Sequence, residues 1–259
     1  MGQAVLYFLG ELNDFLPHSR RGLPQPVKFE GSPAVKHLVE ALGVPHPEVV
    51  CIRMGETPVE VLASAVSQQE VDFSWHVQDG ETFTVCPASA APAGSGVIYA
   101  LGQPAVEPRF VLDNHLGRLA AYLRMLGFDS LYRNDIQDEE LAQVASQERR
   151  ILLTRDRRLL MRSMVIYGYC LRSQAPAVQA VEVLQRYGLA GSVQPFRRCL
   201  RCNGPLQPVS KDQVLERLEP LTRLYYDEFH LCQECGQVYW KGSHYERMEQ
   251  LVQQLTQAL

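Results

Sequence analysis

Two pairs of cysteines near the C-terminus constrain the fold of this chain more than any other feature. Cys199 and Cys202 form one C-x-x-C pair, and Cys232 and Cys235 form the second. The two-residue gap lets both thiolates of a pair bind one ion, and the residues between the pairs suffice for a hairpin or short sheet that brings the pairs together. Four sulfur ligands leave no open coordination position, which is typical of structural zinc. The sequence therefore predicts a zinc ribbon, a module often attached to proteins that handle nucleic acids.

The rest of the composition indicates a cytoplasmic protein. The chain has 259 residues, 46% of them hydrophobic, which is enough for two or three domains. Its seven cysteines are an odd number, and only the four above are regularly spaced, which argues against a disulfide framework and for a reducing compartment. No run of about 18 apolar residues occurs, and the strand-like segment 4–9 is too short for a signal peptide. We expect no association with a membrane.

Charge is unevenly distributed along the chain. Residues 1–108 carry 5 basic and 12 acidic side chains, whereas residues 109–198 carry 14 basic and 9 acidic side chains, and all 14 are arginine. Residues 199–259 carry 6 basic and 8 acidic side chains. Arginine suits bidentate contact with phosphate and stacking on bases. The middle segment is therefore expected to bind nucleic acid, although arginines that are simply solvated would give the same count.

Residues 1–87 are predicted to form a small α+β domain. Segments 4–9 and 25–30 are typical of strands, and Ser32 and Pro33 fit the start of a helix that ends at Gly43. Further strands are predicted at 49–54 and 82–85. This order resembles the ubiquitin-like β-grasp fold, and VQDGETFTVCP at 77–87 is similar to the sulfur carriers of thiamine and molybdopterin synthesis. The chain has no Gly-Gly there and continues past Pro87, so we expect binding of a protein partner instead of sulfur transfer.

Residues 88–108 are rich in Ala, Pro, Gly and Ser and are predicted to be a flexible linker. Beyond them, short apolar runs alternate with amphipathic helices. Strands are predicted at 109–112, 130–132, 151–154 and 169–172. This βαβα alternation predicts an α/β domain over residues 109–197, with a parallel sheet and helices on its faces. Residues 198–259 complete the chain as the zinc ribbon with a C-terminal helix.

Acidic residues follow the first three strands of this α/β domain. Asp113 comes after the first strand, Asp138 and Glu139 after the second, and Asp156 after the third. Parallel strands end at one edge of a sheet, so these carboxylates are expected to lie close together and to share a hard cation such as Mg²⁺ or Mn²⁺. Such an ion could activate water for attack on a phosphodiester. Each aspartate also sits where a helix N-cap belongs, which is the structural alternative.

Five arginines near these carboxylates are expected to hold the nucleic-acid strand: Arg118, Arg124, Arg155, Arg157 and Arg158. Aromatic residues around the second cysteine pair could stack on unpaired bases or could pack the small ribbon.

The blocks of this region resemble the Mut-seven C-terminal RNase domain, a PIN-like nuclease with an appended zinc ribbon. The similar segments are FVLDNHLGRLAAYLRMLGFD at 110–129, DEEL at 138–141, RILLTRD at 150–156, RCLRCNGPL at 198–206, CQEC at 232–235 and YWKGSH at 239–244. The resemblance implies a metal-dependent ribonuclease with acidic positions at Asp113, Asp138 or Glu139, and Asp156. After the fourth strand this chain has Arg-Ser-Gln-Ala at 172–175, where the family pattern has further acidic residues.

The sequence thus predicts a metal-dependent ribonuclease with an N-terminal β-grasp domain, a PIN-like parallel sheet flanked by helices, and a structural zinc ribbon. The competing hypothesis is a catalytically inactive RNA-binding module that uses the arginine-rich surface and the ribbon. The missing acidic residues after the fourth strand favour that second hypothesis.

Overall fold

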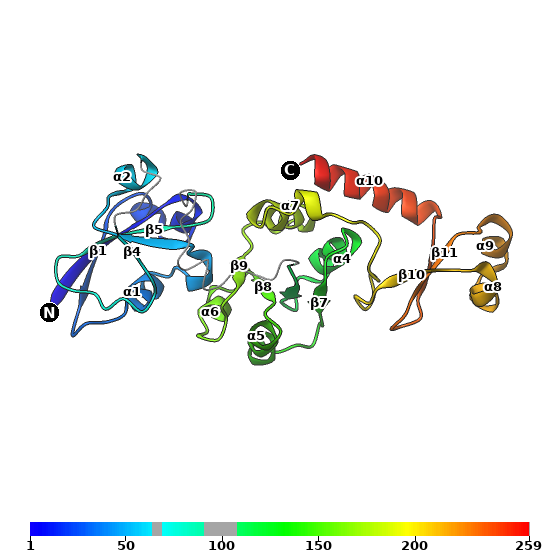
Figure 1. Cartoon of the computed structure of the whole chain (residues 1–259), viewed down its shortest axis with the longest axis horizontal. Helices are drawn as coiled ribbons and strands as arrows, with labels where there is room; N and C mark the ends of the chain where they lie inside the picture. Colours follow the sequence, from blue (N-terminus) through cyan, green and yellow to red (C-terminus); the bar gives the residue numbers. More distant parts are fainter. Residues whose placement is uncertain (64–68, 91–107, 259) are drawn as a thin grey trace. The chain divides into compact units, whose positions relative to one another are not determined.

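The computed structural model describes residues 1–63, 69–90 and 108–258, and these form two compact units (Figure 1). One unit comprises residues 1–106 and 138–170, and the other comprises residues 107–137 and 171–259. Most of the predicted linker, residues 91–107, lies outside the described residues. In the described part of the chain, no helix is long and apolar enough to cross a membrane.

The N-terminal domain is a five-stranded mixed sheet with helix α1 (Val35–Ala41), as predicted for a ubiquitin-like fold. The strand order is β2-β1-β5-β3-β4, and β1 runs parallel to β5 while the other neighbours are antiparallel. Helix α1 buries Val35, Leu38 and Val39. The bounds of the remaining elements are β1 (Gly2–Phe8), β2 (Gln25–Phe29), β3 (Cys51–Met54), α2 (Pro58–Ala63), β4 (Glu70–Val71) and β5 (Thr82–Cys86).

The start of α1 differs from the prediction. Ala34 is the N-cap, and its backbone stays extended because it forms an isolated β-bridge with His76. Ser32 therefore lies before the helix, and its hydroxyl donates to the carbonyl of Val77. The predicted end is confirmed, since Gly43 follows the C-cap with a φ of +90°, a conformation that favours glycine.

The α/β domain contains the predicted four-stranded sheet, in the order β7-β6-β8-β9. Strand β6 pairs with β7, and β8 pairs with β9, in parallel register. The strands are β6 (Phe110–Leu112), β7 (Ser130–Tyr132), β8 (Ile151–Thr154) and β9 (Gly168–Cys170), and the first, third and fourth are buried throughout. The helices are α4 (Gly117–Met125), α5 (Asp138–Gln147), α6 (Arg157–Leu160) and α7 (Pro176–Arg186).

The C-terminal ribbon is a three-stranded antiparallel sheet in the order β10-β11-β12. Its small core consists of Val214, Leu218, Phe229 and Val238. Helix α10, drawn in red in Figure 1, packs beside α7 and buries Val252 and Leu255. The elements are β10 (Leu206–Val209), α8 (Lys211–Val214), α9 (Pro220–Tyr225), β11 (Phe229–Cys232), β12 (Val238–Trp240) and α10 (Ser243–Gln257).

Within the first unit, the ubiquitin-like domain contacts the β8–β9 part of the α/β domain. The carboxylate of Glu48, which is fully buried, accepts a hydrogen bond from the backbone N–H of Cys170 at 2.6 Å. Nε2 of His46 lies 2.6 Å from the carbonyl oxygen of Val165. The guanidinium of Arg157 donates to the carbonyl of Phe15 at 2.9 Å and lies over the Phe15 ring. These polar contacts give the ubiquitin-like domain a docking surface within its own chain.

Candidate metal centre and active site

The four predicted cysteines converge on one point. Their Sγ atoms all lie within 4.8 Å of one another. Sγ of Cys202 lies 3.4 Å from Sγ of Cys232, and Sγ of Cys199 lies 3.6 Å from Sγ of Cys235. A tetrahedral zinc ion with Zn–S bonds of about 2.3 Å places its sulfurs about 3.8 Å apart. The tetrad therefore fits one closed four-sulfur zinc site. Among the described residues, these four cysteines form a cluster whose side chains lie close enough together to hold a metal ion.

Tight turns present the sulfurs. In the first pair, the N–H of Cys199 bonds the carbonyl of Gly204 at 2.8 Å, and the N–H of Asn203 bonds the carbonyl of Cys199 at 2.9 Å. In the second, the N–H of Gly236 bonds the carbonyl of Cys232 at 3.0 Å. Asn203 and Gly236 both have left-handed backbones, with φ of 75° and 72°. Asparagine and glycine are the residues that adopt this conformation most readily, so the local sequence suits the turn in both pairs.

A tyrosine outside the cysteine motif supports the tetrad. The hydroxyl of Tyr239 lies 3.1 Å from Sγ of Cys199 and accepts a hydrogen bond from the N–H of Leu200 at 3.1 Å. Burial raises the pKa of Cys199, but hydrogen bonds from Tyr239 and from the N–H groups of Cys202 and Arg201 outweigh burial and lower the pKa to about 7. The thiolate that a metal requires is therefore favoured at this position.

The ribbon is attached to the second unit's part of the α/β domain through buried polar groups. Arg124, predicted to bind RNA, is buried on α4 and donates to the carbonyls of Ser130, Leu200 and Arg201. Its guanidinium thus holds the first cysteine turn and is not exposed for the RNA contact that the sequence predicts. Asn203 adds a bridge, because its Oδ1 accepts from the N–H of Ser130 and its Nδ2 donates to Asp129, both at 2.8 Å.

The predicted catalytic carboxylates have different local roles. Asp113 is buried directly after β6, and its Oδ1 accepts from the N–H of Asn114 at 2.7 Å and pairs with Nδ1 of His115 at 3.4 Å. It does not cap α4, because the N-cap of that helix is Leu116. Asp156 does cap a helix, since its Oδ1 accepts from the N–H of Arg158 at 2.8 Å at the start of α6. The structural alternative therefore holds for Asp156 and not for Asp113.

The other predicted site residues are mostly exposed. Asp138 and Glu139 lie in the first turn of α5, where negative charge is favourable for a helix. Arg118, Arg155 and Arg158 are exposed, whereas the guanidinium of Arg157 is engaged with the ubiquitin-like domain as described above. Asp113 belongs to one unit, and Asp138, Glu139 and Asp156 belong to the other. A shared cation site for these carboxylates thus stays a prediction.

Sequence reasoning missed a carboxylate at the loop that follows β9. Glu182 on α7 accepts hydrogen bonds from the N–H groups of Arg172 and Ser173, at 3.0 and 2.9 Å. This loop is the place where the expected acidic residues are absent from the sequence. Glu182 is ten residues further along the chain, and nothing in its helical neighbourhood indicates that its side chain folds back on this loop.

The fold and the tetrad define a protein with a ubiquitin-like domain, a parallel α/β domain and a four-cysteine ribbon. Comparison with known families agrees with each part: the Mut7-C RNAse domain matches residues 108–252, and the Mut7-C ubiquitin domain matches residues 1–92. The chain therefore belongs to the Mut7-C RNAse domain family and carries the Mut7-C ubiquitin domain before it. No curated protein and no solved structure matches the chain.

Proposed function

We propose that this protein is a metal-dependent ribonuclease that hydrolyses RNA phosphodiester bonds. Membership of an RNase-domain family implies RNA as the substrate. The observation that carries the proposal is the position of Asp113. Asp113 is a buried carboxylate directly after a central strand, and its Oδ1 lies 3.4 Å from Nδ1 of His115. Carboxylates in such positions are frequently metal ligands or catalytic groups.

The strand order supports a site near Asp113. In a sheet ordered β7-β6-β8-β9, the connections run outward in opposite directions from β6 and β8. Ligands of open parallel sheets bind beyond the carboxyl ends of the strands at such a switch point. Asp113 follows β6 and Asp156 follows β8.

We assign the roles as follows. Asp113 and Asp156 ligate Mg²⁺ or Mn²⁺, and Asp138 or Glu139 orients the attacking water or a second ion. The cation lowers the pKa of the bound water and neutralises charge on the phosphodiester. Arg118, Arg155 and Arg158 hold backbone phosphates of the RNA strand, since their side chains are exposed. The closed cysteine site holds zinc and has no position for water, so its role is structural.

The test compares three aspartate-to-asparagine variants in a cleavage assay with purified zinc-loaded protein and added Mg²⁺ or Mn²⁺. Asp113→Asn retains an acceptor for the N–H of Asn114, and Asp156→Asn retains a good helix cap, so both variants should fold. We expect at least about a hundred-fold loss of cleavage from each, because a metal ligand is weakened. Asp135→Asn is the matched control, because Asp135 is exposed and is assigned no role. Full metal-dependent cleavage by Asp113→Asn would show that the assigned site is wrong.

A second candidate function is RNA binding without cleavage. It is favoured by the loop at 172–175, which lacks the expected acidic residues and whose N–H groups are held by Glu182. Under this function, the protein would bind RNA with a steep salt dependence and would cleave it with neither Mg²⁺ nor Mn²⁺. The same cleavage assay, combined with a binding assay, separates the two functions.

We further propose that the ubiquitin-like domain binds a protein partner on surface left free by its contact with the α/β domain. Leu23 and Val59 are large apolar side chains that are 54% and 76% exposed in this domain. The proposal predicts that replacing both with serine abolishes capture of that partner without changing RNA cleavage. Unchanged capture by the double variant would place partner binding elsewhere.

A further inference from the structure

The loop between β6 and α4 brings a histidine next to the carboxylate on which the proposed function relies. Nδ1 of His115 lies 3.4 Å from Oδ1 of Asp113. The side chain of the aspartate is 8% exposed, whereas that of the histidine is 45% exposed. One loop therefore presents a buried oxygen ligand and an accessible nitrogen ligand side by side. None of the roles proposed above uses the nitrogen.

A contact from the neighbouring strand β7 holds this loop in place. The hydroxyl of Tyr132, on β7, donates to the carbonyl of Asn114 at 2.7 Å. A Cβ atom at Gly117 would lie 2.8 Å from that hydroxyl oxygen, so a larger residue there would displace the tyrosine. The backbone on both sides of His115 is thus fixed by the fold, and so is the place from which its side chain starts.

The 3.4 Å separation is wide for a hydrogen bond and suits two ligands of one metal ion. Hydrogen bonds between nitrogen and oxygen are usually about 2.7–3.2 Å long. Oδ1 of Asp113 already accepts such a bond from the N–H of Asn114, at 2.7 Å. Adjacent ligand atoms on an octahedral ion with bonds of about 2.1 Å lie about 3.0 Å apart. A small rotation of the half-exposed imidazole closes the difference, so the two side chains fit a shared cation.

The chemistry of the two ligands bears on the choice of ion. In phosphoryl-transfer sites, Mg²⁺ usually keeps several waters and binds one or two carboxylates together with phosphates of the substrate. Imidazole nitrogen is instead a common ligand of transition-metal ions. Mn²⁺ is such an ion and also suits carboxylates and water. The imidazole of His115 is therefore a feature that distinguishes between the two ions named in the proposed function.

We propose that Nδ1 of His115 ligates the same divalent cation as Asp113 and makes this site bind Mn²⁺ in preference to Mg²⁺. Ligation uses the lone pair of Nδ1, so the proton of the neutral imidazole is on Nε2. The inference rests on the proposed function in placing a cation at Asp113, and it adds a nitrogen ligand and the choice of ion. A histidine that only pairs with the carboxylate, without binding the ion, is the alternative that the test separates.

Electron spin-echo spectroscopy of bound Mn²⁺ tests the ligation directly, because a coordinated ¹⁴N nucleus modulates the echo. The full chain is loaded with zinc, which is diamagnetic, and then receives substoichiometric Mn²⁺. We expect ¹⁴N modulation from the native protein and its loss in His115→Gln. His37→Gln is the matched control and should retain the modulation, because His37 is an exposed histidine of the ubiquitin-like domain without an assigned role.

Metal titrations of the same variants test the choice of ion. Mn²⁺ affinity is measured from the resonance of the free ion, and Mg²⁺ affinity from its competition with Mn²⁺. His115→Gln should weaken Mn²⁺ binding by about ten-fold or more, since even partners outside the coordination shell usually change metal affinity by about 10- to 100-fold. Its Mg²⁺ affinity should change much less. Asp113→Asn should weaken the binding of both ions, because it removes the charged ligand that they share.

The outcomes separate this inference from the proposed function. If the native protein binds Mn²⁺ and cleaves RNA but the echo has no ¹⁴N modulation, or if the modulation persists in His115→Gln, the inference is overturned and the ribonuclease stands. The same holds if His115→Gln binds both ions like His37→Gln. If the modulation depends on His115 but neither ion supports cleavage, the metal site stands and the ribonuclease activity does not. Binding of neither ion to the native protein would overturn both.

Discussion

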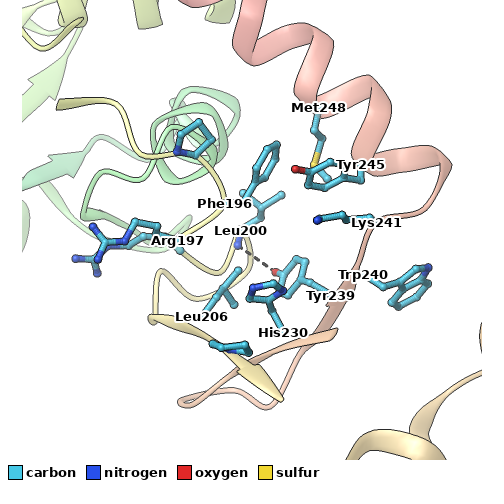
Figure 2. Close-up of a pocket in the computed structure, with 13 residues that line it drawn as sticks. Phe196, Arg197, Leu200, Leu206, His230, Tyr239, Trp240, Lys241, Tyr245 and Met248 are labelled. Carbon is cyan, nitrogen blue, oxygen red and sulfur yellow. Dashed lines mark hydrogen bonds between the residues drawn. The ribbon is translucent and has the colours of Figure 1, made fainter. Parts of the chain in front are cut away.

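The hydroxyl of Tyr239 lies 3.1 Å from Sγ of Cys199, so one side chain both bonds a sulfur of the tetrad and lines a cavity of about 390 Å³ between the ribbon and helix α10 (Figure 2). Partners that bond a metal ligand orient it and tune its basicity. The metal site and the cavity are therefore joined through a single phenol. A substitution that alters one of them should therefore alter the structure of the other.

Removing this hydroxyl should weaken zinc binding. Tyr239→Phe retains the ring in the wall of the cavity but deletes the hydrogen bond to Cys199 and the acceptor for the N–H of Leu200. We expect zinc affinity to fall by about 10- to 100-fold, the usual effect of losing such a partner. Competition with a chromophoric chelator measures it. Tyr225→Phe, at an exposed tyrosine of α9, is the control and should keep native affinity.

Zinc removal should unfold the ribbon and leave the ubiquitin-like sheet intact. The ribbon core consists of only four buried side chains, which is too few to hold three short strands without the metal. Hydrogen exchange after chelation should therefore show lost protection at backbone amides of β10, β11 and β12. Amides of β1 and β5 serve as the internal reference. Retained protection in β11 after complete zinc loss would contradict a structural role for the metal.

Substitution of Arg124 should lower the stability of the protein, whereas substitution of Arg118 on the same helix should lower its RNA binding. Arg124→Ala leaves the carbonyls of Ser130, Leu200 and Arg201 without their charged donor, and we expect a loss of about 2–4 kcal/mol in the free energy of unfolding. Arg118→Ala, at an exposed position, should change stability by less than about 0.5 kcal/mol and should weaken RNA binding. Denaturant unfolding and RNA titration of both variants measure the contrast. Equal stability of the two would show that the buried guanidinium contributes nothing.

Both the backbone conformation and the side chain of Asn203 should contribute to the stability of the protein. Asn203→Gly keeps the left-handed conformation but leaves the buried N–H of Ser130 without an acceptor, which should cost about 1–3 kcal/mol. Asn203→Ala loses the same bond and also adopts positive φ less readily, so it should be about 1 kcal/mol less stable than the glycine variant. Thermal unfolding of the two variants gives the comparison. An alanine variant as stable as the glycine variant would mean that the turn relaxes.

Loss of Glu48 should destabilise the contact between the ubiquitin-like domain and the α/β domain. Glu48→Ala leaves the N–H of Cys170 buried without its carboxylate, at an expected cost of about 1–3 kcal/mol or more. Limited proteolysis and thermal unfolding should both detect the change. Glu30→Ala removes an exposed carboxylate of the same domain and should unfold like the native protein.

Much of the architecture follows from local sequence signals. The two C-x-x-C pairs, the alternation of strands and helices after residue 109, and Gly43 as a helix end are all confirmed, because each depends on residues close together in the chain. The start of α1 was wrong because a β-bridge from Ala34 to His76, 42 positions further on, keeps the backbone extended. Ser32 is a good N-cap residue, but the long-range bridge at Ala34 decides where the helix begins, and no local pattern reveals that bridge.

Local sequence patterns do not reveal the residues that hold the candidate sites in place. Arg124 looks like one more arginine of a basic segment, yet two of its three bonds are to residues 76 and 77 positions away. Tyr239 is 40 positions from Cys199 and reads as an aromatic of the ribbon. The cavity is formed from segments on both sides of the ribbon, so its lining becomes visible only when the chain is folded.

The order of the strands along the chain has a consequence for synthesis on the ribosome. All five strands of the ubiquitin-like sheet lie between residues 2 and 86, so this domain can fold as soon as that stretch has emerged. Helix α4, in contrast, presents the guanidinium of Arg124 to carbonyls that are made 76 residues later. At the 5–20 residues per second typical of translation, that buried charge waits roughly 4–15 seconds for its partners. A nascent chain stalled in this interval would expose the guanidinium of Arg124 and the incomplete sheet beside it. Chaperones would therefore be expected to bind the chain during this interval.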